Sequence, residues 1–301
     1  MLAKEFRTLG GLRIAFRRWG DPQAPAIVLL MGLGMSMDAW PQTMIDGLVQ
    51  EGFQVITPDN RDSGASDRAA SWCVTRSELV WSILRFLMRR RVSGDYALED
   101  MAMDVEHLLD ALGIRRAHIA GVSLGGMIAQ TLAYHCPNRV ATLTSMSSAV
   151  GNPRTGLGSL RAISAVLKAE DSTDPEAQRK HVAHILTALS GSRYKPTNAE
   201  LEAALARAAD IGRDSAAVMR QVMALLASGD RSGQVRQIRV PALVIHGTAD
   251  PLLPFAAGEE TARLISGSQF LPVEGLGHAI PLVLVPLYVR AIASICHAHP
   301  A

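Results

Sequence analysis

The chain has few cysteines, few aromatic residues and no strong excess of either charge. Its 301 residues include only three cysteines, Cys73, Cys136 and Cys296, which lie far apart in the sequence. Such a sparse, odd set provides neither a disulfide framework nor the spacing of a metal site. We therefore interpret the cysteines as free thiols of a reducing compartment, and we expect a cytoplasmic protein with no bound metal.

The charge balance and the short apolar runs exclude other classes of protein. There are 30 basic and 28 acidic residues, so no electrostatic footprint for nucleic acid or for an anionic membrane is present. Apolar runs such as residues 26–31 are far too short to span a bilayer, and Lys4, Glu5 and Arg7 interrupt any signal peptide. We expect a small-molecule substrate and neither a nucleic-acid nor a membrane partner, and we leave a homodimer open.

Short apolar runs alternate with longer helical patterns along most of the chain. This alternation is typical of βαβ units and of a mostly parallel sheet. Hydrophobic residues make up 48% of the chain, which is enough for a large core. Eight strands are predicted, at residues 4–8, 12–17, 26–31, 54–57, 117–120, 141–145, 242–246 and 269–273.

Helices are predicted between these strands, and one block of the chain contains helices alone. Helical spacing of apolar residues occurs at 39–51, 98–112, 124–134, 256–265 and 282–296, and a basic amphipathic stretch at 81–91 predicts a small lid helix. Residues 151–239 lack strand patterns and predict four helices, near 157–169, 174–189, 198–211 and 214–228. The predicted fold class is α/β: a sheet domain of residues 1–150 and 240–301 flanked by helices, with an inserted helical cap at 151–239.

The most specific motif is Gly121-Val122-Ser123-Leu124-Gly125, which fits G-x-S-x-G. It follows an apolar run and opens a helical pattern, and this strand–turn–helix context is what the motif requires. Ser123 would lie on a tight bend, so that its hydroxyl projects above the sheet. Glycines flank the bend at positions 121 and 125 because side chains there would collide with neighbouring backbone. We predict that Ser123 is a nucleophile.

A serine hydroxyl needs a base within hydrogen-bond reach, and that base needs a partner. Among nine histidines, His278 is distinguished by its Gly-rich loop directly after the last predicted strand. Asp250 follows the preceding strand and would hold the imidazole in the correct tautomer. His246 is a weaker competitor for the role of base, since it lies at the end of a strand. The order Ser123, Asp250, His278 is the one found in α/β-hydrolases.

A tetrahedral intermediate also needs two backbone N–H donors, which form an oxyanion hole. The residue after the nucleophile, Leu124, would supply one. The loop after the third predicted strand, Met31-Gly32-Leu33-Gly34-Met35, would supply the other. Leu33 is the preferred donor, and Gly32 is the alternative.

Together these residues resemble the α/β-hydrolase superfamily over nearly the whole chain. Met31-Gly32 stands where many members have His-Gly, and Asp59–Ser66 (DNRDSGAS) stands where many have D-x-R-G-x-G-x-S, with Asp62 in place of a glycine. The pattern is most similar to bacterial esterases of the aclacinomycin methylesterase type. A serine nucleophile argues against the epoxide-hydrolase and haloalkane-dehalogenase branches, which use aspartate.

The resemblance implies a carboxylic ester hydrolase that works through an acyl-enzyme on Ser123 and needs no cofactor. A cap of helices suggests an apolar ester of medium size. Other uses of the same triad stay open: a lactonase, an amidase, a C–C hydrolase or a cofactor-free perhydrolase. A binding protein with this fold and little turnover is the alternative from outside the enzymes.

Overall fold

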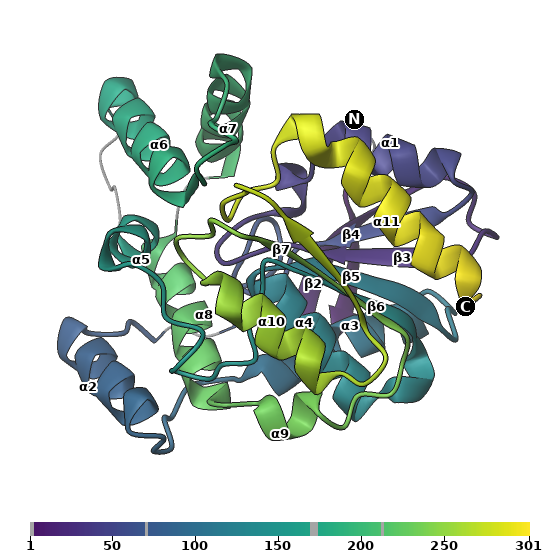
Figure 1. Ribbon diagram of the computed structural model, residues 1–301, viewed down its shortest axis with the longest axis horizontal. Helices are drawn as coiled ribbons and strands as arrows, with labels where there is room; N and C mark the ends of the chain where they lie inside the picture. Colours follow the sequence, from purple (N-terminus) through teal and green to yellow (C-terminus); the bar gives the residue numbers. More distant parts are fainter. Residues whose placement is uncertain (1–2, 70–71, 169–173, 212–213) are drawn as a thin grey trace.

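The structure is a computed structural model, and it describes residues 3–69, 72–168, 174–211 and 214–301. Its centre is an eight-stranded sheet in the order β1-β2-β4-β3-β5-β6-β7-β8 (Figure 1). The β1–β2 and β2–β4 pairs are antiparallel, and the other five pairs are parallel. The strands are β1 Glu5–Leu9, β2 Leu12–Trp19, β3 Ala26–Leu30, β4 Gln54–Pro58, β5 Ala117–Val122, β6 Val140–Met146, β7 Ala242–Gly247 and β8 Gln269–Val273. The predicted mostly parallel sheet is confirmed.

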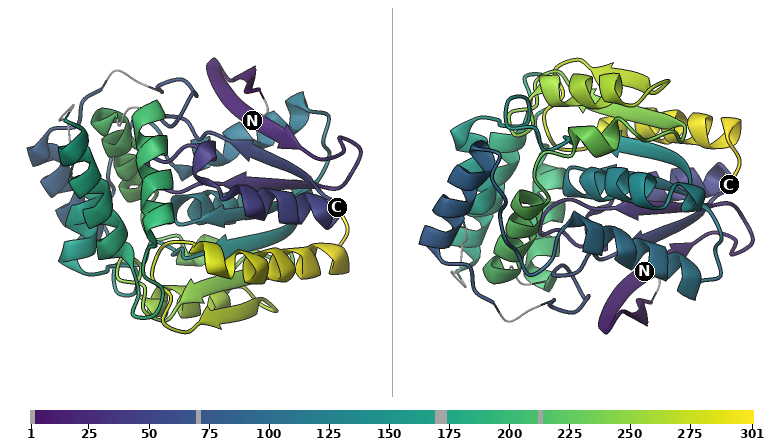
Figure 2. Two further views of the ribbon diagram at one scale, coloured as in Figure 1. Left: turned by 90° about the horizontal axis from the view of Figure 1, so that it is seen from above. Right: turned by 90° about the horizontal axis from the view of Figure 1, so that it is seen from below.

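Helices cover both faces of the sheet (Figure 2). Helices α1 (Gln42–Gln50) and α11 (Val285–Ala298) pack on one face, where their apolar residues share a core with β3 and β7. Helices α3 (Leu98–Ala111), α4 (Leu124–His135) and α10 (Phe255–Leu264) pack on the other. The short 3-10 turns are η1 Met37–Ala39, η2 Pro137–Arg139 and η3 Leu282–Leu284. The helices predicted at 39–51 and 282–296 each begin with such a turn before the α-helix starts.

The chain between β6 and β7 is helical, and we call it the cap segment. It contains α5 (Leu160–Leu167), α6 (Pro175–Leu189), α7 (Asn198–Ile211), α8 (Ser215–Ser228) and α9 (Ser232–Val235). The sequence predicted the first four and missed α9, which is a single turn. Figure 2 shows α2 and α5–α8 gathered beyond one end of the sheet. The domain limits of 151 and 239 stay a prediction, and residues 169–173 and 212–213 of the predicted cap lie outside the described residues.

Helix α2 (Arg76–Leu87) differs from the stretch predicted at 81–91. It begins earlier because Thr75 and Glu78 form a capping box, in which each side chain accepts a hydrogen bond from the other's backbone amide. It ends at Leu87, and Arg89 has a φ of 54° that a helix does not allow. The inner face of the helix carries Phe86, which packs with Met223 and Leu226 of α8. The arginines at 89–91 therefore lie beyond the helix rather than along its edge.

The strand order brings the predicted site residues to one edge of the sheet. Parallel strands end on the same side, so the loops after β3, β5, β7 and β8 all open toward the cap segment. Strand β3 has β4 on one side and β5 on the other. The chain therefore leaves β3 toward one edge of the sheet and later returns to add strands toward the other edge. Ligands in open α/β sheets bind at such a switch point.

Candidate active site

Ser123 lies on a strained bend between β5 and α4. Its φ of 54° and ψ of −119° are unusual for a residue with a side chain. The bend is possible because the residues at positions 121 and 125 are glycines. A Cβ on Gly121 would lie 2.1 Å from the Gly125 carbonyl oxygen, and a Cβ on Gly125 would lie 2.1 Å from the Leu30 carbonyl oxygen. Strain of this kind costs energy and is found mainly at functional sites. Here it leaves the Ser123 side chain half-buried at the start of α4.

The structure brings Ser123, His278 and Asp250 into one chain of hydrogen bonds. His278 Nε2 lies 3.0 Å from Ser123 Oγ, and His278 Nδ1 lies 2.8 Å from Asp250 Oδ2. These three residues come from the loops after β5, β8 and β7, which are separated by up to 155 positions in the sequence. The imidazole therefore has one nitrogen for the hydroxyl and the other for the carboxylate.

The carboxylate of Asp250 is fixed on both oxygens. Its Oδ1 accepts hydrogen bonds from the amides of Leu252 and Leu253, both at 2.9 Å, and its Oδ2 faces His278. Burial acts to raise the pKa of Asp250, but the charge of His278 and the hydrogen bond from its ring outweigh burial and hold the pKa below its usual value. Asp250 is thus built to stay ionised beside His278.

His246, the competing candidate for the base, is held away from the serine. Its Nε2–H donates to the Leu253 carbonyl at 2.8 Å, and its side chain is fully buried. Burial lowers the pKa of His246 and so favours the neutral ring. The structure places it behind Asp250, with 3.6 Å between its Nε2 and Asp250 Oδ2. His246 therefore packs beside Asp250, and none of the hydrogen bonds among the described residues joins it to Ser123.

The loop after β3 passes directly over Ser123. A Cβ on Gly32 would lie 3.4 Å from Ser123 Cβ and 4.0 Å from Ser123 Oγ. A turn closes the loop, with the Met35 amide donating to the Gly32 carbonyl at 3.2 Å. The Gly34 amide is also occupied, because it donates to Gln221 Oε1 at 2.8 Å. Among the hydrogen bonds of the described residues, none is donated by the amides of Gly32 or Leu33, so both predicted donors stay candidates.

A second loop, Asp59–Ser66, contacts the loop Met31–Met35 after β3, which we call the oxyanion loop after the role predicted for it. Asn60 Nδ2 donates to the Met31 carbonyl at 3.0 Å. Asp59 Oδ1 accepts from the Met37 amide at 2.5 Å, while its Oδ2 accepts from the Ala65 amide at 2.8 Å. The Asp59–Ser66 loop therefore holds the backbone at Met31 and Met37, on either side of the oxyanion loop, through the side chains of Asn60 and Asp59.

Asp62, which stands in place of a glycine, joins this loop to the cap segment. Its φ is 64°, which explains why glycine is common at the position. Its side chain is fully buried, and it pairs with Arg220 of α8, whose Nη2 lies 2.6 Å from Asp62 Oδ1. The Tyr96 hydroxyl donates to Asp62 Oδ2 at 2.7 Å. A residue that looked like a departure from the family is therefore half of a buried ion pair between two regions of the chain.

Gln221 of α8 was not predicted from the sequence, and its side chain is fully buried where the cap segment meets the core. Its Oε1 accepts from Gly34 of the oxyanion loop, and its Nε2 donates to the Arg61 carbonyl at 2.7 Å and to Ser63 Oγ at 2.8 Å. One signal was available: Arg220 and Gln221 interrupt an otherwise apolar helix (AAVMRQVMALLA). Buried polar residues in such a context need partners, and here both find them in the core.

The cap segment also holds the loop that carries His278. The His278 amide donates to the Leu189 carbonyl at 2.9 Å, and the Arg193 amide donates to the Gly275 carbonyl at 3.0 Å. These two segments of the chain approach so closely that a Cβ on Gly277 would lie 2.2 Å from the Gly191 nitrogen. Both the His278 backbone and the oxyanion loop are thus in direct contact with residues of the cap segment.

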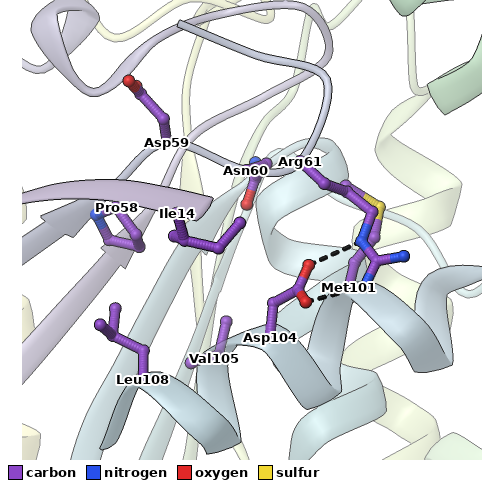
Figure 3. Close-up of a pocket in the computed structure, with 9 residues that line it drawn as sticks. All are labelled: Ile14, Pro58, Asp59, Asn60, Arg61, Met101, Asp104, Val105 and Leu108. Carbon is purple, nitrogen blue, oxygen red and sulfur yellow. Dashed lines mark hydrogen bonds and ion pairs between the residues drawn. The ribbon is translucent and has the colours of Figure 1, made fainter. Parts of the chain in front are cut away.

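A small cavity beneath the Asp59–Ser66 loop is separate from this site. Figure 3 shows Arg61 reaching down to Asp104 of α3, with Arg61 Nε 2.6 Å from Asp104 Oδ2, while Asp59 turns away from the cavity. The space measures about 10 Å³ and is bordered by none of the proposed catalytic residues. It has room for about one water molecule, so it is not a substrate site.

Metal sites and membrane spans are not found among the described residues. Within the described ranges, no group of three or more His, Cys, Asp or Glu side chains is arranged to hold a metal ion. Over the same part of the chain, none of the helices combines the length and apolar character needed to cross a bilayer.

Comparison with known proteins agrees with this architecture. Residues 25–283 match the model of the alpha/beta hydrolase fold family. Rhodomycin D methylesterase DnrP of Streptomyces peucetius is 26% identical over 296 residues, covering 91% of this chain and 92% of that protein. 3-Oxoadipate enol-lactonase 2 of Acinetobacter baylyi is 25% identical over 294 residues, covering 93% and 96%.

A solved structure shares the fold at lower identity. The crystal structure of the enol-lactonase from Burkholderia xenovorans LB400 superposes with a TM-score of 0.71 at 22% identity, covering 97% of this chain and all of that one. The methylesterase match fits the resemblance to aclacinomycin-type esterases stated above, at modest identity. The family model covers well over half of the sequence, and the chain belongs to the α/β-hydrolase fold family.

Proposed function

We propose that the protein hydrolyses carboxylic esters through an acyl-enzyme on Ser123. The observation that carries this proposal is the position of His278, whose ring lies between the Ser123 hydroxyl at 3.0 Å and the Asp250 carboxylate at 2.8 Å. A positioned imidazole is what a serine hydroxyl needs in order to attack at neutral pH. The strained bend at Ser123 supports the same role.

The reaction follows from these contacts in two halves. Ser123 Oγ attacks the ester carbonyl carbon while its proton passes to His278 Nε2, and Asp250 stabilises the resulting imidazolium. The tetrahedral intermediate collapses, the C–O bond to the alkoxide breaks, and the alkoxide takes the proton from His278. Water then attacks the acyl-enzyme with the help of His278, which releases the acid and restores the Ser123 hydroxyl.

The negative charge on the carbonyl oxygen needs donors that are already in place. We assign them to the amides of Leu124, at the N-terminus of α4, and Leu33, with Gly32 as the alternative. The positive end of α4 adds to the stabilisation, since Leu124 is its first residue. The loop amide at Gly34 is excluded because Gln221 occupies it.

Similarity supports an ester as the first substrate class to test. The relative from Streptomyces peucetius is a methylesterase, and the match extends over almost the full length of both proteins. Methyl esters therefore belong in the assay panel beside p-nitrophenyl esters.

A lactone is the second candidate, favoured by the match to 3-oxoadipate enol-lactonase 2. A lactone is a cyclic ester, so the same residues carry out the same steps and the leaving alkoxide stays attached to the acyl group. Hydrolysis of vinylogous diketones tests the C–C hydrolase alternative, and formation of a peracid from an ester and hydrogen peroxide tests the perhydrolase alternative. The substrate with the highest kcat/KM decides among these classes.

The proposal is tested with a fluorophosphonate probe and steady-state kinetics. The probe is expected to label the wild-type protein and to leave Ser123→Ala unlabelled, and the same variant is expected to lose ester hydrolysis. Labelling that persists in Ser123→Ala would remove Ser123 from its role. A labelled wild-type protein with no turnover of any panel member would favour the binding-protein alternative.

A further inference from the structure

The oxyanion loop has a second support that comes from the cap segment rather than the core. Helix α8 packs so tightly against it that a Cβ on Gly34 would lie 2.6 Å from Val218 Cγ2. Gly34 also has a φ of 65°, which a side chain rarely adopts. The loop and the helix therefore meet at a fixed contact, one residue after the proposed oxyanion donor Leu33.

Gln221 spans this contact with its whole amide group. Its oxygen accepts from the Gly34 amide at 2.8 Å, and its nitrogen donates to the Arg61 carbonyl at 2.7 Å and to Ser63 Oγ at 2.8 Å. The side chain is fully buried, so water does not compete for these bonds. A satisfied buried amide of this kind holds its partners in one geometry.

We propose that Gln221 is a positioning residue for the oxyanion hole. By accepting from the Gly34 amide it fixes the turn Gly32–Met35, and so it sets where the neighbouring Leu33 and Gly32 amides point above Ser123. By donating to Arg61 and Ser63 it ties that turn to the Asp59–Ser66 loop. The inference rests on the proposed function, since an oxyanion must form for the geometry to matter.

The proposal separates Gln221 from its neighbour Arg220. Arg220 pairs with Asp62 and joins the same helix to the same loop, but it makes no contact with the oxyanion loop among the hydrogen bonds of the described residues. A role in holding the cap segment would be shared by both residues. Of these two neighbours, only Gln221 contacts the oxyanion loop, so a role in aligning the oxyanion donors would belong to Gln221 and not to Arg220.

The test uses Gln221→Met, which keeps the volume and removes all three hydrogen bonds. Its rate constant for fluorophosphonate labelling and its kcat for a p-nitrophenyl ester are both expected to fall about 10- to 100-fold, less than the loss of a donor itself. KM is expected to change little, because the donors act mainly on the transition state. A trifluoromethyl ketone, which forms a tetrahedral adduct, is expected to bind more weakly by a similar factor.

Ser63→Ala is the matched control, because it removes one bond of Gln221 and leaves the bond to Gly34. Its labelling rate and kcat are expected to stay within about threefold of wild type. If Gln221→Met does not fold, Gly34→Ala pushes the loop away from Val218 with Gln221 in place. Slower labelling is again expected, with partial recovery when Val218→Ala makes room.

The outcomes distinguish this inference from the proposed function. Folded Gln221→Met that labels as fast as wild type, or that loses kcat only as much as Ser63→Ala, overturns the role of Gln221 and leaves Ser123 as the nucleophile. A wild-type protein that is not labelled at all overturns both. A rise in KM with unchanged kcat also contradicts the proposal, because it would place Gln221 in substrate binding.

Discussion

The core and the cap segment contribute different things to one site. Ser123, Asp250 and His278 come from the core, each on a loop that directly follows a strand of the sheet. Gln221 and the Leu189 carbonyl come from the cap segment, and they contact the oxyanion loop and the His278 loop rather than the reacting atoms. In the proposed mechanism the core therefore supplies the reacting groups, and the cap segment supplies part of the geometry in which they work.

The largest expected effect is in the core, with Asp250→Asn. The amide can still accept from Leu252 and Leu253, so the loop keeps its shape. The amide carries no charge to stabilise the imidazolium, and it favours the wrong tautomer of His278. The kcat is therefore expected to fall about 10³- to 10⁴-fold, as in other triads. Steady-state kinetics with an ester and a thermal melt measure the two effects separately. Near-normal activity in the folded variant would point to a different acid.

The next effect is in the cap segment and concerns stability rather than chemistry. Arg220→Met leaves the buried Asp62 carboxylate without its cation, which is expected to cost about 3–5 kcal/mol in the free energy of unfolding. Because Asp62 has a positive φ, Asp62→Gly suits the backbone and also removes the unpaired charge. The double variant Asp62→Gly/Arg220→Met is therefore expected to be more stable than Arg220→Met alone.

Urea denaturation of the wild type, both single variants and the double variant measures this coupling. Independent, additive changes would mean that the ion pair does not join the cap segment to the core.

A smaller effect is expected where the cap segment meets the His278 loop. Gly277→Ala introduces a Cβ that would lie 2.2 Å from the Gly191 nitrogen and 2.3 Å from the Leu189 carbonyl oxygen. The backbone must separate there, at a cost of about 1–3 kcal/mol, and the base should be less well placed. We expect a lower melting temperature together with a lower kcat. Gly233→Ala is the control, since a Cβ at Gly233 would meet nothing within 4 Å beyond its own helix. A Gly277→Ala variant with the same melting temperature and kcat as Gly233→Ala would contradict the close packing.

The smallest effect near neutral pH concerns the core alone, and it grows only as the pH falls. His118 is buried in β5, and burial lowers the pKa of His118 to about 4. The unfolded chain takes up this proton near pH 6.5, so the folded state loses stability as the pH falls from about 6.5 toward 4. His118→Gln is expected to make the free energy of unfolding less dependent on pH in that window. His246 contributes in the same direction, so the slope should shrink rather than vanish, and an unchanged slope would contradict the assignment.

The sequence predicted the core well because its signals are local. A buried parallel strand followed by Gly121-Val122-Ser123-Leu124-Gly125 specifies a bend whatever the rest of the chain does. The strand limits and the pairing of Asp250 with His278 follow from the same regular alternation. The end of the helix at Leu87 was missed because the following arginines continue the helical pattern, while the backbone at Arg89 does not.

The cap contacts were not predicted because they depend on packing between distant segments. Gln221 and Gly34 are separated by 187 positions, and nothing near either residue specifies the other. Asp62 was noticed only as a missing glycine, because its partner Arg220 lies 158 positions away. A polar pair in an apolar helix signals that partners exist, but the sheet topology decides which loops they reach.

The most direct test of the account is to trap the acyl group. Wild-type protein mixed with p-nitrophenyl acetate and quenched within one turnover is expected to carry one acetyl group, located on Ser123 by peptide mass spectrometry. A burst of p-nitrophenol equal to the enzyme concentration should accompany it. Hydrolysis that proceeds with no acetyl group on Ser123, or with the group on another residue, would contradict the account.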